Sequence, residues 1–239
     1  MQGVSDAIRN SCNHYFYEVG YRLGLVGDVF NSNVGLERLK KYADLYGLTE
    51  KSGVEIDEAE PHVSDELPVL SAIGQGTNNF TTVSMARYTA TVANSGTCYN
   101  LTLLDKLTDH NKTLLEDYQA EVRNRIDMPE SYWDAIHTGM RRVVEAKRYF
   151  NNFGVQVAGK TGTAQESKSR TNHALFVCYA PYENPEIAIT TRIAFGYSSD
   201  YAARTTREVL KYYYNLEDAE EIINGTAATM ESGIISNEW

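Results

Sequence analysis

The 239-residue chain is poor in three features, and each scarcity excludes a class of protein. No uninterrupted apolar run approaches the twenty residues that cross a bilayer, so we expect no transmembrane helix within the chain. Cysteine occurs only three times and never as Cys-x-x-Cys, and the five histidines are scattered, which argues against a disulfide framework and a zinc site. Basic residues number 22 against 32 acidic ones, and the net charge of −10 argues against nucleic acid as a partner. We expect neither a metal nor a cofactor.

The first two thirds of the chain carry apolar residues at helical spacing, separated by polar and glycine-rich stretches. Stripes at spacings of three and four residues, bounded by capping residues or glycine, predict helices over 15–23, 36–46, 82–93 and 129–144. The intervening segments 25–35 and 50–68 are predicted to be loops. Most of 101–127 is polar and is predicted to lie on the surface.

The last third is rich in β-branched residues and turn signals. Strands are predicted over 157–165, 174–180 and 187–193, consecutive and antiparallel. Ser198 and Ser199 then precede a helix that can cover the sheet with Ala202, Thr206, Val209 and Tyr213. From residue 215 onward the chain has six acidic residues and no basic one, which predicts a solvated tail over 215–239. The fold class is therefore α+β, with one domain over 1–214.

One short stretch of the first predicted strand concentrates chemically useful groups. Lys160 offers a positive charge, Thr161 and Thr163 offer hydroxyls, and Gly162 allows another backbone to come close. Such a strand edge suits a peptide-like, anionic ligand bound by strand addition. The alternative is a β-hairpin without a binding function that ends in a turn of small residues.

A second polar cluster, Ser11-Cys12-Asn13, stands directly before the first aromatic helix. Ser11 or Asn13 could be no more than the N-cap of that helix. Cys12 is interpreted as a packing residue, because a reactive thiolate needs a cationic setting.

Ser-x-Asn and Lys-Thr-Gly are two of the three motifs shared by β-lactamases and penicillin-binding proteins. With them, the chain resembles the transpeptidase domain of a class B penicillin-binding protein, most of all the elongation-type enzymes of Gram-positive bacteria. The similarity covers about residues 5–214 and includes segments 36–53, 73–96, 157–165 and 174–189. It implies a penicillin-binding or β-lactamase-like fold, in which a helical subdomain faces antiparallel strands backed by a C-terminal helix.

The chain departs from the family in one respect. No serine is followed by lysine three positions later, so the Ser-x-x-Lys nucleophile and its base are missing. In the family they precede the Ser-x-Asn motif, together with two strands and a central helix. We therefore expect the fold to be incomplete at its N-terminus, and the chain alone to be inactive.

The resemblance assigns catalytic roles to three residues. Ser11 would relay a proton between the nucleophile and the leaving nitrogen, since a hydroxyl both donates and accepts. Asn13 would hold the substrate amide and the missing lysine. Lys160 would keep the site electropositive and assist the proton relay.

The resemblance assigns substrate binding to the residues that follow. Thr161 and Thr163 would bind the substrate carboxylate, and the Thr163 N–H would form half of an oxyanion hole. Gly162 would let the substrate lie against the strand. The implied ligands are peptidoglycan stem peptides ending in D-alanyl-D-alanine and, for the intact protein, β-lactam antibiotics. The implied setting is the outer side of the cell membrane, with an upstream anchor and the cell-wall elongation machinery as partner.

Three functions stay open at this point. The first is peptidoglycan D,D-transpeptidase, which the 147 positions between Asn13 and Lys160 favour. The second is a β-lactamase. The third is a non-catalytic sensor or binding module of the same fold, which the missing nucleophile favours.

Overall fold

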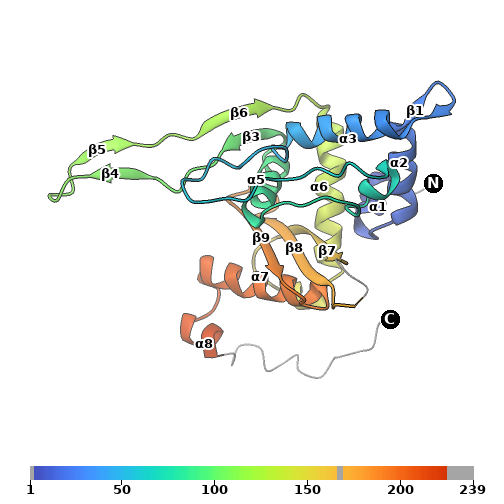
Figure 1. The fold of residues 1–239 in the computed structure, drawn as a ribbon. Helices are drawn as coiled ribbons and strands as arrows, with labels where there is room; N and C mark the ends of the chain where they lie inside the picture. The colour runs from blue at the N-terminus through green and yellow to red at the C-terminus, as the bar shows by residue number, and fades with distance from the viewer. Residues whose placement is uncertain (1–2, 166–168, 225–239) are drawn as a thin grey trace.

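The computed structural model describes residues 3–165 and 169–224 (Figure 1). Helices and strands alternate unevenly along the chain, with most helices before the main sheet, so the α+β class is confirmed. The helices are α1 (Val4–Arg9), α2 (Asn13–Leu23), α3 (Ser32–Leu45), α4 (Pro68–Ser71), α5 (Thr82–Ala93), α6 (Glu130–Glu145), the 3-10 turn η1 (Arg148–Phe150), α7 (Ser199–Tyr213) and α8 (Ala219–Asn224).

The main sheet has the order β7-β8-β9 and is antiparallel throughout, as predicted. Its strands are β7 (Ala158–Ala164), β8 (His173–Ala180) and β9 (Ile187–Ile193). In this sheet β8 is central, so β7 and β9 each have one edge without a strand partner among the described residues. The Lys-Thr-Gly stretch therefore lies on an edge strand.

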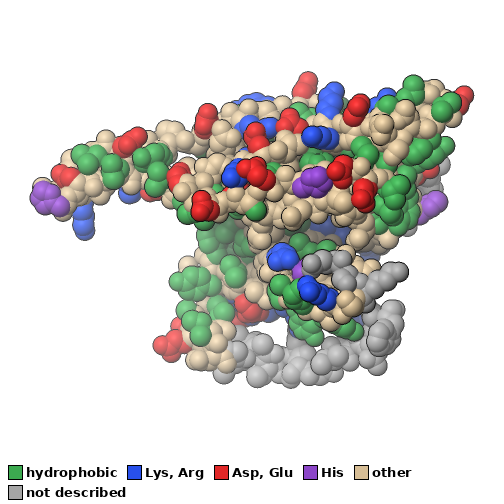
Figure 2. Space-filling model, in the orientation of Figure 1, with side chains coloured by type: hydrophobic (Ala, Val, Ile, Leu, Met, Phe, Trp, Pro, Cys, Tyr) green, Lys and Arg blue, Asp and Glu red, His purple; other side chains and the backbone are tan. Residues whose placement is uncertain are grey.

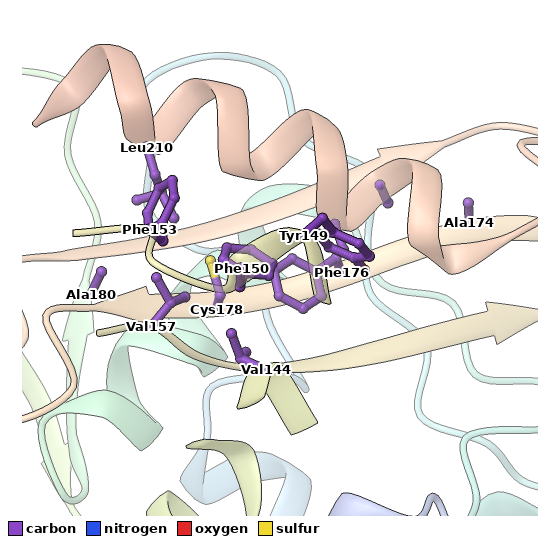
Figure 3. Close-up of a cluster of buried hydrophobic side chains, with 12 residues drawn as sticks. Val144, Tyr149, Phe150, Phe153, Val157, Ala174, Phe176, Cys178, Ala180 and Leu210 are labelled. Carbon is purple, nitrogen blue, oxygen red and sulfur yellow. The ribbon is translucent and has the colours of Figure 1, made fainter. Parts of the chain in front are cut away.

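Period-two alternation along β8 divides its side chains between two cores. Phe176 and Cys178 point toward α7, where Ala203 and Leu210 cover them; Tyr149, Phe150 and Phe153 complete this cluster (Figure 3). Tyr179 points the other way and packs with Val92 of α5 and Met140 of α6. The sheet is thus enclosed between α7 and the pair α5–α6.

Capping side chains begin three of the helices. Asn31 Oδ1 accepts from the N–H groups of Asn33 and Val34, and Thr81 Oγ1 accepts from Ser84 N–H at 3.1 Å. Ser198 Oγ accepts from Asp200 N–H at 3.3 Å. These bonds satisfy N–H groups that a helix start leaves without partners.

The face of α7 that covers the sheet differs from the predicted one. Ala202 and Thr206 are buried as expected, but Val209 and Tyr213 are about half exposed. Leu210 and Lys211 are buried in their place. The predicted stripe followed the correct period but was rotated by one residue at the C-terminal end of the helix.

Two segments predicted as loop or plain surface form strands. Within 25–35, β1 (Leu25–Val26) and β2 (Val29–Phe30) make a small hairpin, and α3 already begins at Ser32. Within 101–127, β4 (Lys106–Thr108) pairs with β5 (Leu114–Asp117), and β6 (Glu121–Arg125) pairs with β3 (Thr97–Asn100), which precedes that segment. β1 and β2 have two residues each, too few to show a period, and β4 and β5 are exposed at every position, so hydrophobic periodicity did not mark these strands.

Residues just after position 214, where the tail is predicted to begin, contact the body of the protein. Lys211 Nζ forms an ion pair with Glu217 at 2.8 Å, and Leu216 lies 3.5 Å from where a Cβ on Gly154 would stand. Helix α8 follows, and residues 225–239 of the predicted tail lie outside the described part. The helices of the described part include none that is both long and apolar enough to span a membrane.

Candidate active site

Helix α6 packs against the two elements that carry the candidate site residues, α1 with the segment after it and strand β7. On one side α1 packs against it: Ser5 Oγ donates to Ala135 O at 2.7 Å, and Asp6 pairs with Arg142 at 3.0 Å. On the other side β7 packs against it, and Arg141 Nη1 donates to Val157 O at 3.0 Å. The end of α1 and the edge strand β7 are thereby brought together.

Ser11 and Lys160 meet at this junction. Lys160 Nζ donates to Ser11 Oγ at 2.5 Å, although 149 positions separate them in the chain. Ser11 follows Asn10, the C-cap of α1, and has φ of 48°, in the left-handed region that a non-glycine residue rarely adopts. Backbone strain of this kind concentrates at functional sites.

The capping alternative for this cluster does not hold. The N-cap of α2 is Cys12, and no side chain makes a capping hydrogen bond there. The Ser11 hydroxyl is therefore left to Lys160. Asn13 is the first residue of α2, and its side chain is exposed to solvent.

The ammonium group of Lys160 lies in a poorly solvated place. It also donates to Thr161 O at 2.8 Å, and among the described residues it has no ion-pair partner. Burial, followed by the nearby charge of Lys147, lowers the pKa of Lys160 from 10.5 to about 8. At that value a lysine can both give and take a proton near neutral pH.

The remaining predicted residues line the exposed end of the same strand. Thr161 and Gly162 are half buried, and Thr163 is exposed. A Cβ added to Gly162 would meet, among the described residues, only Leu175 Cβ at 3.5 Å. One added to Gly159 would lie 2.6 Å from Phe176 Cζ. Packing therefore requires Gly159 to be glycine, whereas Gly162 leaves open space beside the strand.

The sequence and fold were compared with known proteins. The model of the penicillin-binding protein transpeptidase domain matches residues 1–211. The chain belongs to this family.

Individual relatives agree with the family. The chain is 28% identical to the peptidoglycan D,D-transpeptidase MrdA of Haemophilus influenzae, over 89% of this chain and 36% of the relative. It is 27% identical to penicillin-binding protein 2A of Bacillus subtilis, over 92% of this chain and 35% of the relative. The chain thus spans about a third of the length of the curated relatives it matches.

A solved structure supports the fold. The imipenem acyl-enzyme complex of penicillin-binding protein A from M. tuberculosis superposes with a TM-score of 0.73 at 24% identity. The similarity covers 87% of this chain and 46% of the other. The penicillin-binding transpeptidase fold is therefore confirmed for this chain.

Sequence reasoning missed one part of the site in this penicillin-binding transpeptidase chain. Lys147, which lowers the pKa of Lys160, is held by Asp200 Oδ1 at 2.8 Å, and the same oxygen accepts from Tyr149 OH at 2.9 Å. These residues join the end of α6, η1 and the start of α7. Residues 147–154 carry no periodic signal that would place Lys147 beside the Lys-Thr-Gly strand.

Proposed function

We propose that this chain is part of a peptidoglycan D,D-transpeptidase and forms one wall of its active site. The contact between Lys160 Nζ and Ser11 Oγ carries the proposal, because it joins the Ser-x-Asn and Lys-Thr-Gly motifs in space. Membership of the transpeptidase family supports it. The serine nucleophile would come from residues that these 239 do not include.

The proposed reaction is acyl transfer in two steps. The nucleophilic serine attacks the carbonyl of the penultimate D-alanine, loses its proton, and releases the terminal D-alanine as a free amine-bearing product. The amine of a neighbouring stem peptide then attacks the ester, and the serine takes back a proton. A new amide bond replaces the one that was broken.

Ser11 and Lys160 would carry protons between these steps. The Ser11 hydroxyl accepts from Lys160 and can donate onward to the leaving nitrogen, so the pair forms a relay. Because the pKa of Lys160 is near 8, the proton is exchanged at low cost around neutral pH. Asn13 would hold the substrate amide and the base that accompanies the nucleophile.

The substrate would lie along the free edge of β7. Thr161 and Thr163 would bind its carboxylate, and the Thr163 N–H would contribute to the oxyanion hole. The open space beside Gly162 suits the approach of a peptide backbone. Stem peptides ending in D-alanyl-D-alanine are the proposed substrates.

The proposal extends to the whole protein. Imipenem acylates the similar M. tuberculosis protein, which supports β-lactams as ligands of the intact enzyme. We place the catalytic domain on the outer side of the cell membrane, in the elongation machinery of a Gram-positive bacterium. That placement depends on the sequence resemblance.

Fluorescent penicillin tests this function in the full-length protein. We expect a label that forms rapidly and stays bound for many minutes, because a transpeptidase hydrolyses its penicilloyl ester slowly. Fast release of the label would identify a β-lactamase instead. Absence of any label would support the non-catalytic module and refute both enzyme functions. The isolated 239-residue chain is the matched control, and we expect it to remain unlabelled.

A further inference from the structure

A two-stranded arm projects from the body of the molecule. We define the arm as residues 103–118, which contain β4, β5 and the turn between them (Figure 1). Every side chain of both strands is exposed. The leucines of the arm are between 44% and 63% exposed, namely Leu103, Leu104, Leu107, Leu114 and Leu115. Apolar side chains are visible along it in Figure 2.

The base and tip of the arm are both fixed by hydrogen bonds. At the base, Glu55 accepts from Thr102 Oγ1 at 2.5 Å and from Leu103 N–H at 2.8 Å. At the tip, Asp109 Oδ1 accepts from the N–H groups of Asn111 and Thr113, both at 2.8 Å. These bonds give the arm a defined direction and a closed turn.

An isolated ladder of this kind is poorly stabilised in water. Two strands without a third strand or a covering layer are marginal, because they bury little apolar surface. Both outer edges of the β4–β5 ladder also lack a strand partner in the described part of the chain. Exposed leucines beside open strand edges are the features that strand addition uses.

The charge of the arm restricts which partners can bind to it. The arm carries an excess of negative charge. It has four carboxylates, on Asp105, Asp109, Glu116 and Asp117, and two ammonium groups, on Lys106 and Lys112. An antiparallel pairing of the whole of β5 with its own copy would set Leu114 opposite Asp117 and Leu115 opposite Glu116, so that each leucine meets a carboxylate in place of an apolar side chain. An anionic lipid surface would also repel the arm.

We propose that the arm is a docking site for an apolar, Lys- or Arg-bearing segment of a different protein, which adds to it as a third strand. The leucines supply the apolar contact, and the excess of carboxylates selects a basic partner. The proposal is independent of the proposed catalytic function.

Site-specific photo-crosslinking in the cells that make the full-length protein tests this docking. A photoreactive phenylalanine analogue replaces Leu115, and the matched control replaces Tyr132, which is 60% exposed on α6. Mass spectrometry identifies the captured peptide. We expect one segment from another protein, apolar and net basic, at position 115 and not at position 132.

Charge reversal decides whether the capture is specific. The variant E116K/D117K should reduce crosslinking at least tenfold, and the milder E116Q should reduce it less. E130K, at the exposed start of α6, should leave it unchanged. All variants should keep the wild-type melting temperature and penicillin labelling. Capture of a second copy, of lipid, of an acidic segment or of nothing, or a yield unaffected by E116K/D117K, would overturn the proposal.

Discussion

Replacing Lys160 by methionine should stabilise the folded chain at neutral pH. The fold holds the Lys160 ammonium group where burial and the charge of Lys147 oppose it, and this lowers its pKa from 10.5 to about 8. Methionine keeps most of the side-chain volume without the charge. A loss of stability at Lys160 agrees with the proposal that its environment is shaped for chemistry.

The magnitude follows from the fall in pKa. Each pH unit corresponds to about 1.4 kcal/mol, so the fall corresponds to an upper limit of about 3 kcal/mol. The variant loses the hydrogen bonds to Ser11 Oγ and Thr161 O, and at about 1 kcal/mol each these losses offset about 2 kcal/mol of that gain. We therefore expect the free energy of unfolding of Lys160→Met to exceed that of the wild type by up to about 1 kcal/mol at pH 7.

The stability difference between the wild type and Lys160→Met should depend on pH in a definite direction. Between pH 8 and 10.5 the unfolded chain keeps the Lys160 proton while the folded chain has released it, so wild-type stability rises with pH over that interval. The advantage of the variant should therefore shrink from pH 7 to pH 10. Urea unfolding followed by the fluorescence of buried Trp133, at several protein concentrations, measures both quantities. An equal or less stable variant at pH 7, or a pH-independent difference, would refute the reasoning.

Three further outcomes are expected from the packing. Gly159→Ala should destabilise the chain by about 2–3 kcal/mol in urea unfolding, because its Cβ would collide with Phe176. Gly162→Ala should change stability by less than about 1 kcal/mol, and equal effects of the two variants would contradict the contacts. A maleimide should modify half-buried Cys12 in the native chain and spare Cys178, which is fully buried and whose thiol pKa is raised by that burial. Mass spectrometry after digestion identifies the modified cysteine, and modification of Cys178 first would contradict its burial in the core. The open edge of β9 should make the 239-residue chain self-associate, as size-exclusion chromatography with light scattering would detect, and a strictly monomeric chain at high concentration would argue against it.

The sequence predicted those elements whose patterning is strong. The periodic stripe that includes Trp133 and Met140 located α6, and the alternating run through Phe176 and Cys178 located β8. The pairing of two distant motifs also came from the sequence, through resemblance to a family. The contact between Lys160 and Ser11 could not be predicted from the sequence. It depends on how α1 and β7 both pack against α6, which is a property of the tertiary structure.

Other features had no readable signal. The strands β4 and β5 are exposed on all sides, so their residues follow no apolar alternation. The stretch around Tyr149 and Phe150 reads as a polar loop, yet its aromatic rings fill the core beneath α7. Whether a residue such as Lys147 lies near Lys160 depends on how that core packs. Local propensity does not contain this information.

A double-mutant cycle on penicillin acylation tests the central claim that Ser11 and Lys160 act as one unit. The second-order rate constant for labelling is measured in the full-length protein for the wild type, Ser11→Ala, Lys160→Met and the double variant. Each single change should slow acylation at least a hundredfold with the fold intact, and the double variant should be little slower than either, because both remove the same relay. Effects that multiply independently, or Ser11→Ala labelled at the wild-type rate, would contradict the account.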